Sequence, residues 1–223
     1  MHLTRLSPNV RSREFRRDFA DVHDMHRTLM SAFPDVVAGT PARHTHGVLW
    51  RLDPSTAGYT HYVQSLTAPD WGKLPAGYLA RPAETRSLKP VVDAVAPGRK
   101  LMFRLQANPT RDSRPPELEG SSRRVAHQSA DDQVAWLCRK GELHGFVIPT
   151  AADGRPDVAP SPLPRLSGQK DGTRITVDAV RFDGHLVVTD PIAFREALVN
   201  GIGRAKAYGC GLITLAVPHT SSG

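Results

Sequence analysis

The order of predicted strands and helices restricts the fold of this chain more than any other feature, because each half of the sequence shows the same order. Strand-like runs and helical segments alternate as β-α-β-β-α-β in both halves, although no repeat is visible in the residues themselves. This order is typical of ferredoxin-like domains. We therefore predict an α+β fold of two tandem ferredoxin-like, RRM-related domains, at residues 1–85 and 99–218, joined by a linker at 86–98.

The main helical signal of the first half is an apolar stripe between residues 15 and 33. Its apolar residues recur at spacings of three and four, and Asp21 can cap a second helix, so we expect a break near Ala20. The stretch 82–99 has no clear periodicity, which supports the linker. The other predicted elements of this half are strands at 3–6, 48–52, 59–66 and 77–81 and a helical turn at 69–71.

In the second half, apolar and polar residues alternate from 174 to 190 around Asp183-Gly184. An Asp-Gly pair between alternating runs is typical of a tight hairpin turn. We therefore predict a β-hairpin that turns at these two residues. The other predicted elements of this half are strands at 100–106, 145–149 and 211–217 and helices at 131–140 and 192–199.

The composition is strongly basic. The chain has 223 residues and a formal net charge of +7, so its surface should carry a positive field. Polyanions are the natural partners of such a surface. Charge alone says nothing of geometry, and a basic composition that serves only solubility is the alternative.

The cysteines and the apolar runs bear on location. Cys138 in a predicted helix and Cys210 in a glycine-rich segment do not indicate a disulfide-stapled secreted domain, so we expect a reducing, cytoplasmic environment. The first residues contain no apolar signal core, and no apolar run is long enough to span a bilayer. We therefore expect no membrane role.

His26 lies within the apolar stripe of the first helical segment, between Val22 and Leu29. One interpretation is a satisfied core histidine. The other is that this face lines a cleft, where a partly desolvated imidazole transfers protons near neutral pH. His23 lies one turn earlier, either facing solvent or close enough to approach the same substrate atom. Periodicity alone does not separate these interpretations.

A metal site is the third possibility for the histidines. His23-x-x-His26 and His44-x-His46 could together present four imidazoles to one ion. Their spacing matches no common zinc-ligand pattern. We therefore predict neither a metal nor another cofactor.

A glycine-rich segment follows the last predicted helix, at residues 201–211. Gly201 and Gly203 can let backbone N–H groups face a phosphate, while Arg204 and Lys206 neutralise its charge. The segment is neither a P-loop nor a dinucleotide fingerprint, because it lacks the required glycine and Gly-Lys-Ser/Thr positions. A tight helix-to-strand connection explains the glycines equally well.

A second turn signal, Asp171-Gly172, has cationic and polar residues on both sides. A protruding basic ribbon suits the phosphates that flank an RNA groove, although a solvated charge cluster is the alternative. Arg123 with Arg124, and Arg111 with Arg114, are less localised candidates of the same kind. The residues of the predicted basic hairpin are Arg165, Gln169, Lys170 and Arg174.

Several sequence blocks occur in the same order as in a known family. They are Met25-His26-Arg27-Thr28-Leu29, Trp50-Arg51-Leu52, Gln64-Ser65-Leu66-Thr67 with Pro69-Asp70-Trp71, Phe103-Arg104-Leu105-Gln106-Ala107-Asn108-Pro109, Ala179-Val180-Arg181-Phe182-Asp183-Gly184 and the glycine-rich 201–212. With these blocks the chain resembles the CRISPR-associated endoribonuclease CasE family, the repeat-RNA processing subunit of the type I-E Cascade complex. The resemblance extends over nearly the whole chain.

The resemblance implies cleavage of CRISPR precursor RNA at the base of the repeat stem-loop, with His26 as a catalytic residue. It also implies that the glycine-rich loop lies beside the cleavage site, that the basic hairpin enters the groove of the RNA stem and that Arg27 is among the RNA-binding residues. His23 stands where the family often has tyrosine, so the catalytic partner of His26 stays open. Expected partners are the precursor and mature repeat RNA and other Cascade subunits, with a monomer when isolated.

The chemistry expected of such a site needs no metal. A base removes the proton of a ribose 2′-OH, the oxygen attacks the adjacent phosphate in line, and an acid protonates the departing 5′-oxygen. The products are a 2′,3′-cyclic phosphate and a 5′-hydroxyl. A non-catalytic RNA-binding subunit with the same two-domain platform is the alternative, and a zinc-dependent hydrolase is a third hypothesis.

Overall fold

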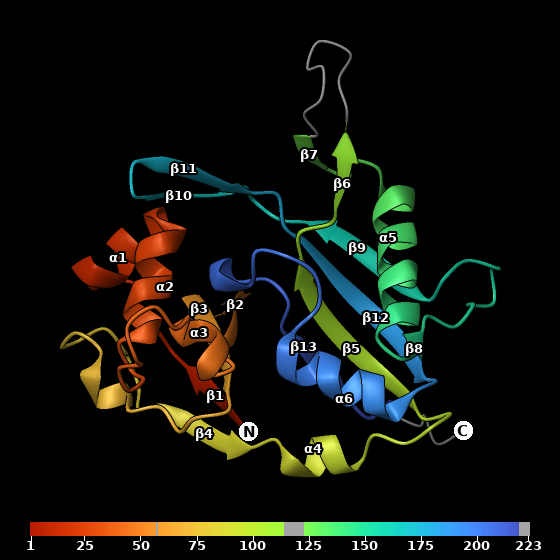
Figure 1. The fold of residues 1–223 in the computed structure, drawn as a ribbon, viewed down its shortest axis with the longest axis horizontal. Coiled ribbons are helices and arrows are strands. Elements are labelled where there is room, and N and C mark those ends of the chain that lie inside the picture. Colours follow the sequence, from red (N-terminus) through yellow and green to blue (C-terminus); the bar gives the residue numbers. More distant parts are fainter. Residues whose placement is uncertain (57, 114–122, 219–223) are drawn as a thin grey trace.

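The computed structural model describes residues 1–56, 58–113 and 123–218, in two halves that each contain one main antiparallel sheet (Figure 1). The strand order of the first sheet is β2-β3-β1-β4. The first strand thus lies between the third and the fourth, as in ferredoxin-like domains. The elements of this half are β1 His2–Leu6, α1 Arg13–Ala20, α2 Val22–Met30, α3 Ala42–Thr45, β2 Leu49–Ser55, β3 Gly58–Ser65, the 3-10 helix η1 Trp71–Lys73, β4 Glu84–Ser87 and α4 Lys89–Asp93.

The second half repeats that topology with additions. Its sheet has the order β13-β5-β12-β8, and β9 pairs with the other part of β12. Because both sheets have the ferredoxin strand order, the predicted fold class is confirmed. The elements are β5 Lys100–Ala107, β6 Thr110–Ser113, β7 Arg123–Ala126, α5 Ala130–Leu143, β8 Phe146–Val147, β9 Val158–Pro162, β10 Leu166–Lys170, β11 Thr173–Val177, β12 Val180–Val188, α6 Pro191–Asn200, the 3-10 helix η2 Lys206–Tyr208 and β13 Ile213–Ala216.

The predicted break in the first helical segment is confirmed at Asp21. Its backbone is extended and its side chain accepts hydrogen bonds from the N–H groups of His23 and Asp24, which caps α2. Phe15 and Leu29 are buried as the stripe predicts, whereas Phe19 is 51% exposed. Phe19 lies in α1 together with Phe15, so the break at Asp21 does not cause its exposure. Its ring lies at the border of an apolar cavity, with its centroid 4.9 Å from that of Tyr59.

The predicted strand at 77–81 is wrong. Leu79 forms only an isolated bridge with Pro8, and the fourth strand of the first sheet is β4, further along the chain. All four residues of β4 are exposed, so no hydrophobic alternation marks them as a strand. Residues 82–99, which we interpreted as linker, therefore contain β4 and α4. The domain boundaries stay a prediction.

The predicted hairpin at Asp183-Gly184 is also wrong, because β12 continues through both residues. Gly184 lies opposite Phe103 in β5, and a Cβ atom on it would stand 2.8 Å from the Cα atom of Val158 in β9. Gly184 thus serves the close approach of two strands. The Asp-Gly pair that does turn is Asp171-Gly172, whose φ angles of 50° and 75° suit a tight hairpin.

Buried polar contacts join the two halves. Arg51 of β2 is 2% exposed, and its side chain donates a hydrogen bond to the Thr214 hydroxyl of β13 over 3.2 Å. Gln64 of β3 donates to the carbonyl of Leu198 in α6, and Trp50 donates over 3.2 Å to the carbonyl of Ala207. Buried polar groups are costly to leave unpaired. These hydrogen bonds therefore hold the first sheet against α6 and the glycine-rich loop.

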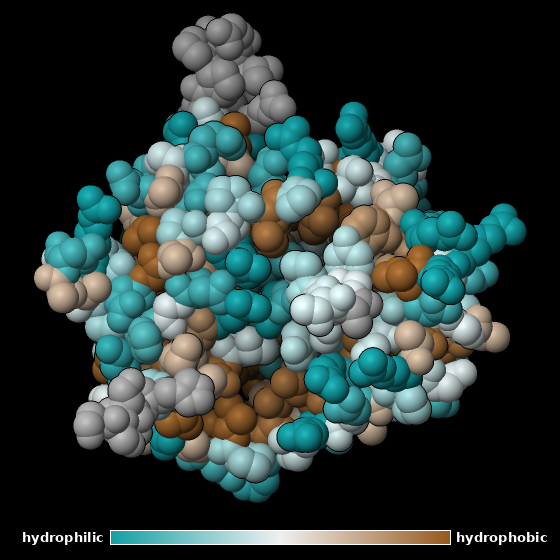
Figure 2. Space-filling model, turned by 180° about the vertical axis from the view of Figure 1, so that it is seen from behind, coloured by the Kyte–Doolittle hydropathy of each residue, from teal (hydrophilic) through white to brown (hydrophobic). Residues whose placement is uncertain are grey.

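The surface behind the view of Figure 1 is mostly hydrophilic, with hydrophobic side chains in separate patches (Figure 2). Pro90 and Val91 of α4 line a shallow cavity of about 190 Å³ together with Leu215 of β13. Among the described residues, no helix is long and apolar enough to cross a membrane.

Candidate active site

Helix α2 presents His23 and His26 one turn apart, while Val22, Met25 and Leu29 of the same helix are buried in the core of the first half. The ring centroids of the two histidines lie 6.5 Å apart. Tyr208, from the glycine-rich loop of the second half, lies with its ring centroid 6.4 Å from each. The two imidazoles and the phenol therefore share one small space between the halves.

The environment of His26 favours its neutral form. Burial is the main cause that lowers the pKa of His26 to about 4, and the charges of His23, Arg43 and Lys170 act in the same direction. Its Nδ1 atom is buried and has no hydrogen-bond partner among the described residues. A neutral imidazole at pH 7 can accept a proton.

His61 of β3 shows what a sealed core histidine looks like in this chain. It is 0% exposed, packs against Phe15 and Trp50, and burial lowers its pKa to about 3. His26 is less enclosed, with an intermediate exposure. The structure therefore leaves His26 open enough to meet a ligand, and its catalytic role stays a prediction.

The predicted basic hairpin is formed by β10 and β11, and it extends from the second half across α2 (Figure 1). The backbone N–H of Gln169 donates to Asp21 Oδ2 over 3.0 Å. Lys170 lies close enough to His26 to influence its pKa. Arg165 is held in an ion pair with Asp178, 2.6 Å apart. The hairpin thus places a cation beside the histidines.

The glycine-rich loop packs tightly as well as facing the site. Gly201, Gly203 and Gly209 have positive φ angles of 74°, 82° and 78°. A Cβ atom would stand 2.7 Å from Leu49 at Gly201, 3.1 Å from Trp136 at Gly203 and 3.0 Å from Trp50 at Gly209. The interpretation as a tight connection therefore holds for these glycines, and a phosphate-binding role is a separate proposal.

Two neighbouring cavities border this loop. One, of about 360 Å³, has Gly201, Gly203, Arg204 and Lys206 in its lining. The other, of about 400 Å³, is bordered by Arg174, Arg204 and Tyr208. The structure thus brings together the predicted residues of the loop and one residue of the hairpin. Further basic residues of the first cavity are Arg111, Arg124, Lys140 and His144.

Three members of the site were not predicted from the sequence. Arg43 of α3 and Lys140 of α5 lie near Lys206, where burial first and then these two charges lower the pKa of the lysine. Tyr208 is the third. Lone residues in polar surroundings carry no spacing signal, so only the tertiary contacts identify them. Arg114 lies outside the described residues, and Arg27 is exposed, with Asp24 at 3.5 Å.

The structure does not assemble the four imidazoles of the metal hypothesis. His46 Nδ1 lies 2.9 Å from the Thr67 hydroxyl and Nε2 lies 3.0 Å from the carbonyl of Pro34. Both ring nitrogens are therefore engaged within the first half. In the described ranges, no group of three or more His, Cys, Asp or Glu side chains is arranged to hold a metal ion.

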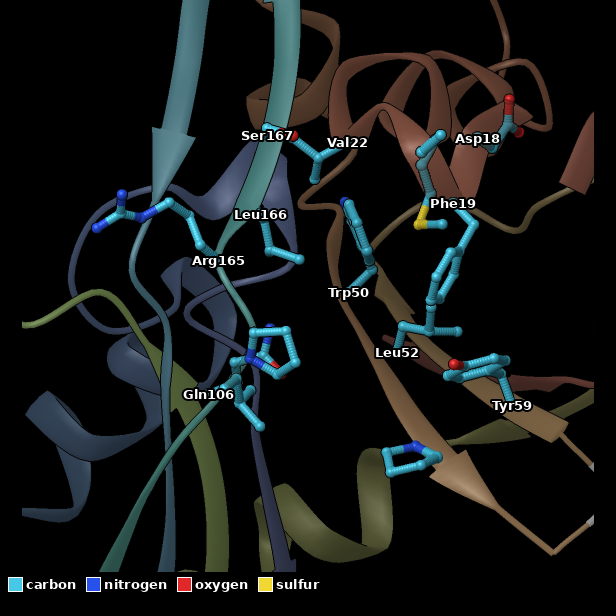
Figure 3. Close-up of a pocket in the computed structure, with 15 residues that line it drawn as sticks. Asp18, Phe19, Val22, Trp50, Leu52, Tyr59, Gln106, Arg165, Leu166 and Ser167 are labelled. Carbon is cyan, nitrogen blue, oxygen red and sulfur yellow. The ribbon is translucent and has the colours of Figure 1, made fainter. Parts of the chain in front are cut away.

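An apolar cavity of about 330 Å³ lies where the start of the hairpin meets the first half (Figure 3). Val22 of α2, Trp50 of β2 and Leu166 of β10 line it, and Arg165 points away from it. The hairpin is therefore not closely packed along its whole length.

Comparisons with known proteins agree on one family. A family model described as "CRISPR associated protein" matches residues 1–217. The endoribonuclease Cse3 of Thermus thermophilus is 36% identical over 97% of this chain and 100% of its own, and the Cascade subunit CasE of Escherichia coli is 30% identical over 77% and 89%. A structure of Cse3 bound to 19 nt RNA has a TM-score of 0.79 and 35% identity, and covers 97% of this chain and 100% of that one.

Proposed function

The chain belongs to the CRISPR-associated CasE/Cse3 family, and we propose that it is an endoribonuclease that cleaves the precursor RNA of CRISPR repeats. The observation that most supports this proposal is that His23 and His26 of α2 lie close to Tyr208 and to basic residues of the second half. The relative that covers 97% of this chain is named as an endoribonuclease, and the one that covers 77% is named as a Cascade subunit. These names support the proposed assignment.

The proposed reaction is attack of a ribose 2′-oxygen on the adjacent phosphorus. His26, neutral at pH 7, is one acid–base group: as a base it takes the 2′-OH proton while the O2′–P bond forms. The P–O5′ bond breaks and the leaving oxygen takes a proton, with His23 as the proposed second group. The products are a 2′,3′-cyclic phosphate and a 5′-hydroxyl, and no metal takes part.

Basic residues of the second half bind the RNA in this proposal. Arg204 and Lys206 stabilise the charge that develops on the scissile phosphate, together with backbone N–H groups near Gly201 and Gly203. The hairpin residues Arg165, Gln169, Lys170 and Arg174, with Arg27 of α2, contact the flanking phosphates.

The proposed substrate is the repeat stem-loop, cut at its base. A two-half site suits a folded RNA, because the stem can rest on the basic face of the second half while the junction reaches α2. The protein then stays with the product as a subunit of a Cascade-type complex, as the name of the Escherichia coli relative suggests.

Incubation of the purified protein with its own repeat RNA in excess EDTA tests the proposal. We expect one cut with cyclic phosphate and 5′-hydroxyl ends, and no cut in an RNA with a single 2′-deoxyribose at the scission site. Binding without cleavage would instead support a non-catalytic RNA-binding subunit. Cleavage that stops in EDTA and returns with zinc would support a metal-dependent hydrolase.

A further inference from the structure

The side-chain carboxylate of Asp21 joins the cap of α2 to the basic hairpin. Its Oδ1 atom accepts the N–H groups of His23 over 2.8 Å and Asp24 over 3.2 Å, and its Oδ2 atom accepts the N–H of Gln169 over 3.0 Å. A carboxylate uses both oxygens here, one for each half of the molecule. We propose that Asp21 is a positioning residue that sets the hairpin against the histidine-bearing helix.

The hairpin backbone is shaped for this contact. A Cβ atom on Gly168 would stand 3.1 Å from the backbone nitrogen of His23 and would also collide with Asp21. Gly168 therefore allows β10 to approach the first turn of α2 as closely as the bond requires. The Gln169 N–H belongs to the outer edge of β10, because the register pairs Lys170 with Thr173 next to the turn and leaves this N–H directed away from β11.

The bond adds a polar contact to an apolar one. Leu166 and Ile175 of the hairpin pack against the core of the first half, and an apolar cavity lined by Leu166, Val22 and Trp50 lies beside them (Figure 3). Further along, the hairpin reaches α2 at Gln169, one residue before Lys170, whose charge acts on His26. Release of Gln169 would therefore let Lys170 move relative to the histidine.

This role rests on the proposed function, since it assigns Asp21 an effect on the rate of RNA cleavage. A shift of about 1 Å in a catalytic group can slow a reaction by roughly 100-fold without loss of substrate binding. The predicted signature is thus a loss in rate at saturating RNA with little change in affinity.

Asp190 provides a matched control. It caps α6 with the same geometry, since its Oδ1 atom accepts the N–H groups of Ile192 over 2.8 Å and Ala193 over 3.1 Å. Among the described residues, its side chain has no hydrogen bond that reaches the other half. Asparagine is a good N-cap but has a single acceptor oxygen, so Asp→Asn at either position keeps the cap, and only Asp21→Asn breaks the bridge.

The test is single-turnover cleavage and RNA affinity of Asp21→Asn and Asp190→Asn. We expect the first variant to cleave about 10- to 100-fold more slowly at saturating RNA, with a Kd within about threefold of wild type, and the second to keep both values. Equal rates for the two variants would overturn the proposal, as would a loss confined to affinity.

A reciprocal pair tests the bridge from the hairpin side. Gln169→Pro removes the donor N–H at an edge position, and Gln169→Ala removes only the side chain. We expect Asp21→Asn and Gln169→Pro to slow cleavage without adding to each other, and Gln169→Ala to fall short of either. Effects that multiply would contradict a shared bond.

Amide hydrogen exchange separates this proposal from the proposed function. The Gln169 amide should be protected in wild type and exchange at least tenfold faster in Asp21→Asn, whether or not the protein cleaves RNA. A wild-type protein that fails to cut repeat RNA defeats the proposed function. Unchanged exchange at Gln169 defeats the bridge.

Discussion

In the first half, the connection from β1 to β2 carries the two histidines, whereas in the second half the equivalent connection carries β6, β7 and α5. The halves also differ between their second and third strands. Ser55 and Gly58 close the hairpin of β2 and β3 directly, but β9, β10 and β11 are inserted between β8 and β12. The long insertion of the second half reaches across to α2 of the first half.

The two halves share one topology but contribute different groups to the proposed site. The first half supplies titratable side chains on a short helix, and the second supplies the hairpin, the glycine-rich loop and most of the basic residues around them. The proposed site needs both the histidines of the first half and the hairpin and loop of the second, because Tyr208 and Lys170 approach His26 only through the contact between the halves. Changes on the two sides should therefore have different kinetic signatures.

The largest effect should come from the first half. His26→Ala is expected to slow cleavage by about 1000-fold with RNA affinity within a few-fold of wild type, because general acid–base groups contribute rate and little binding. Single-turnover cleavage and filter binding measure the two quantities. The exposed His44 is a matched control, and His44→Ala should cleave at the wild-type rate.

Acid should destabilise the fold through two buried histidines of the first half. Burial holds the pKa of His26 at about 4 and that of His61 at about 3, both below the value of about 6.5 for an exposed histidine, so the unfolded state binds more protons as pH falls below 6.5. Stability is therefore fully present above that value and decreases below it. When pH falls from about 6.5 to about 4.5, the free energy of unfolding should decrease in both proteins. We expect the decrease to be smaller in His61→Phe than in wild type, by on the order of 2 kcal/mol.

Urea unfolding at the two pH values measures this difference. The two variants His61→Phe and His26→Ala should both flatten the pH dependence, since each removes a histidine that is neutral in the folded state. An unfolding free energy whose pH dependence is the same in His61→Phe as in wild type would show that this ring does not resist protonation.

A smaller effect should come from the second half, and it should appear in binding. Arg174→Ala is expected to weaken RNA affinity about fivefold to tenfold and to reduce the slope of log affinity against log salt by about one, with the cleavage rate at saturation kept. Titrations at several salt concentrations measure both. Arg86→Ala, on the exposed edge strand β4, should leave both unchanged.

The sequence predicted the architecture well where hydrophobic periodicity was strong. The pattern from Phe15 to Phe33 predicted two helices and the capping role of Asp21, because apolar spacing and cap chemistry are local properties. It failed at β4, whose exposed residues have no apolar face, and at Asp183-Gly184. There the close approach of β9 decided the conformation, and a local turn signal contains no information about a third strand.

The site was predictable only in part for the same reason. His23, His26, the glycine-rich loop and the hairpin each have a local signal or a match to family blocks. Arg43 and Lys140 have none, and Tyr208 lies within a matching block but has no signal of its own, since their place beside the histidines or Lys206 follows from how the halves meet. The bridge from Asp21 to Gln169 joins residues 148 positions apart, so no local pattern contains it.

The central claim is that His26 faces the RNA across from the basic residues of the second half. Nitrogen-15 NMR titration of the histidine rings, free and bound to an uncleavable 2′-deoxy repeat RNA, tests it directly, with the sealed His61 as an internal reference. A phosphate beside His26 should raise its pKa from about 4 by at least about one unit, while His61 does not change. Equal titration of His26 in the free and RNA-bound protein would contradict the account.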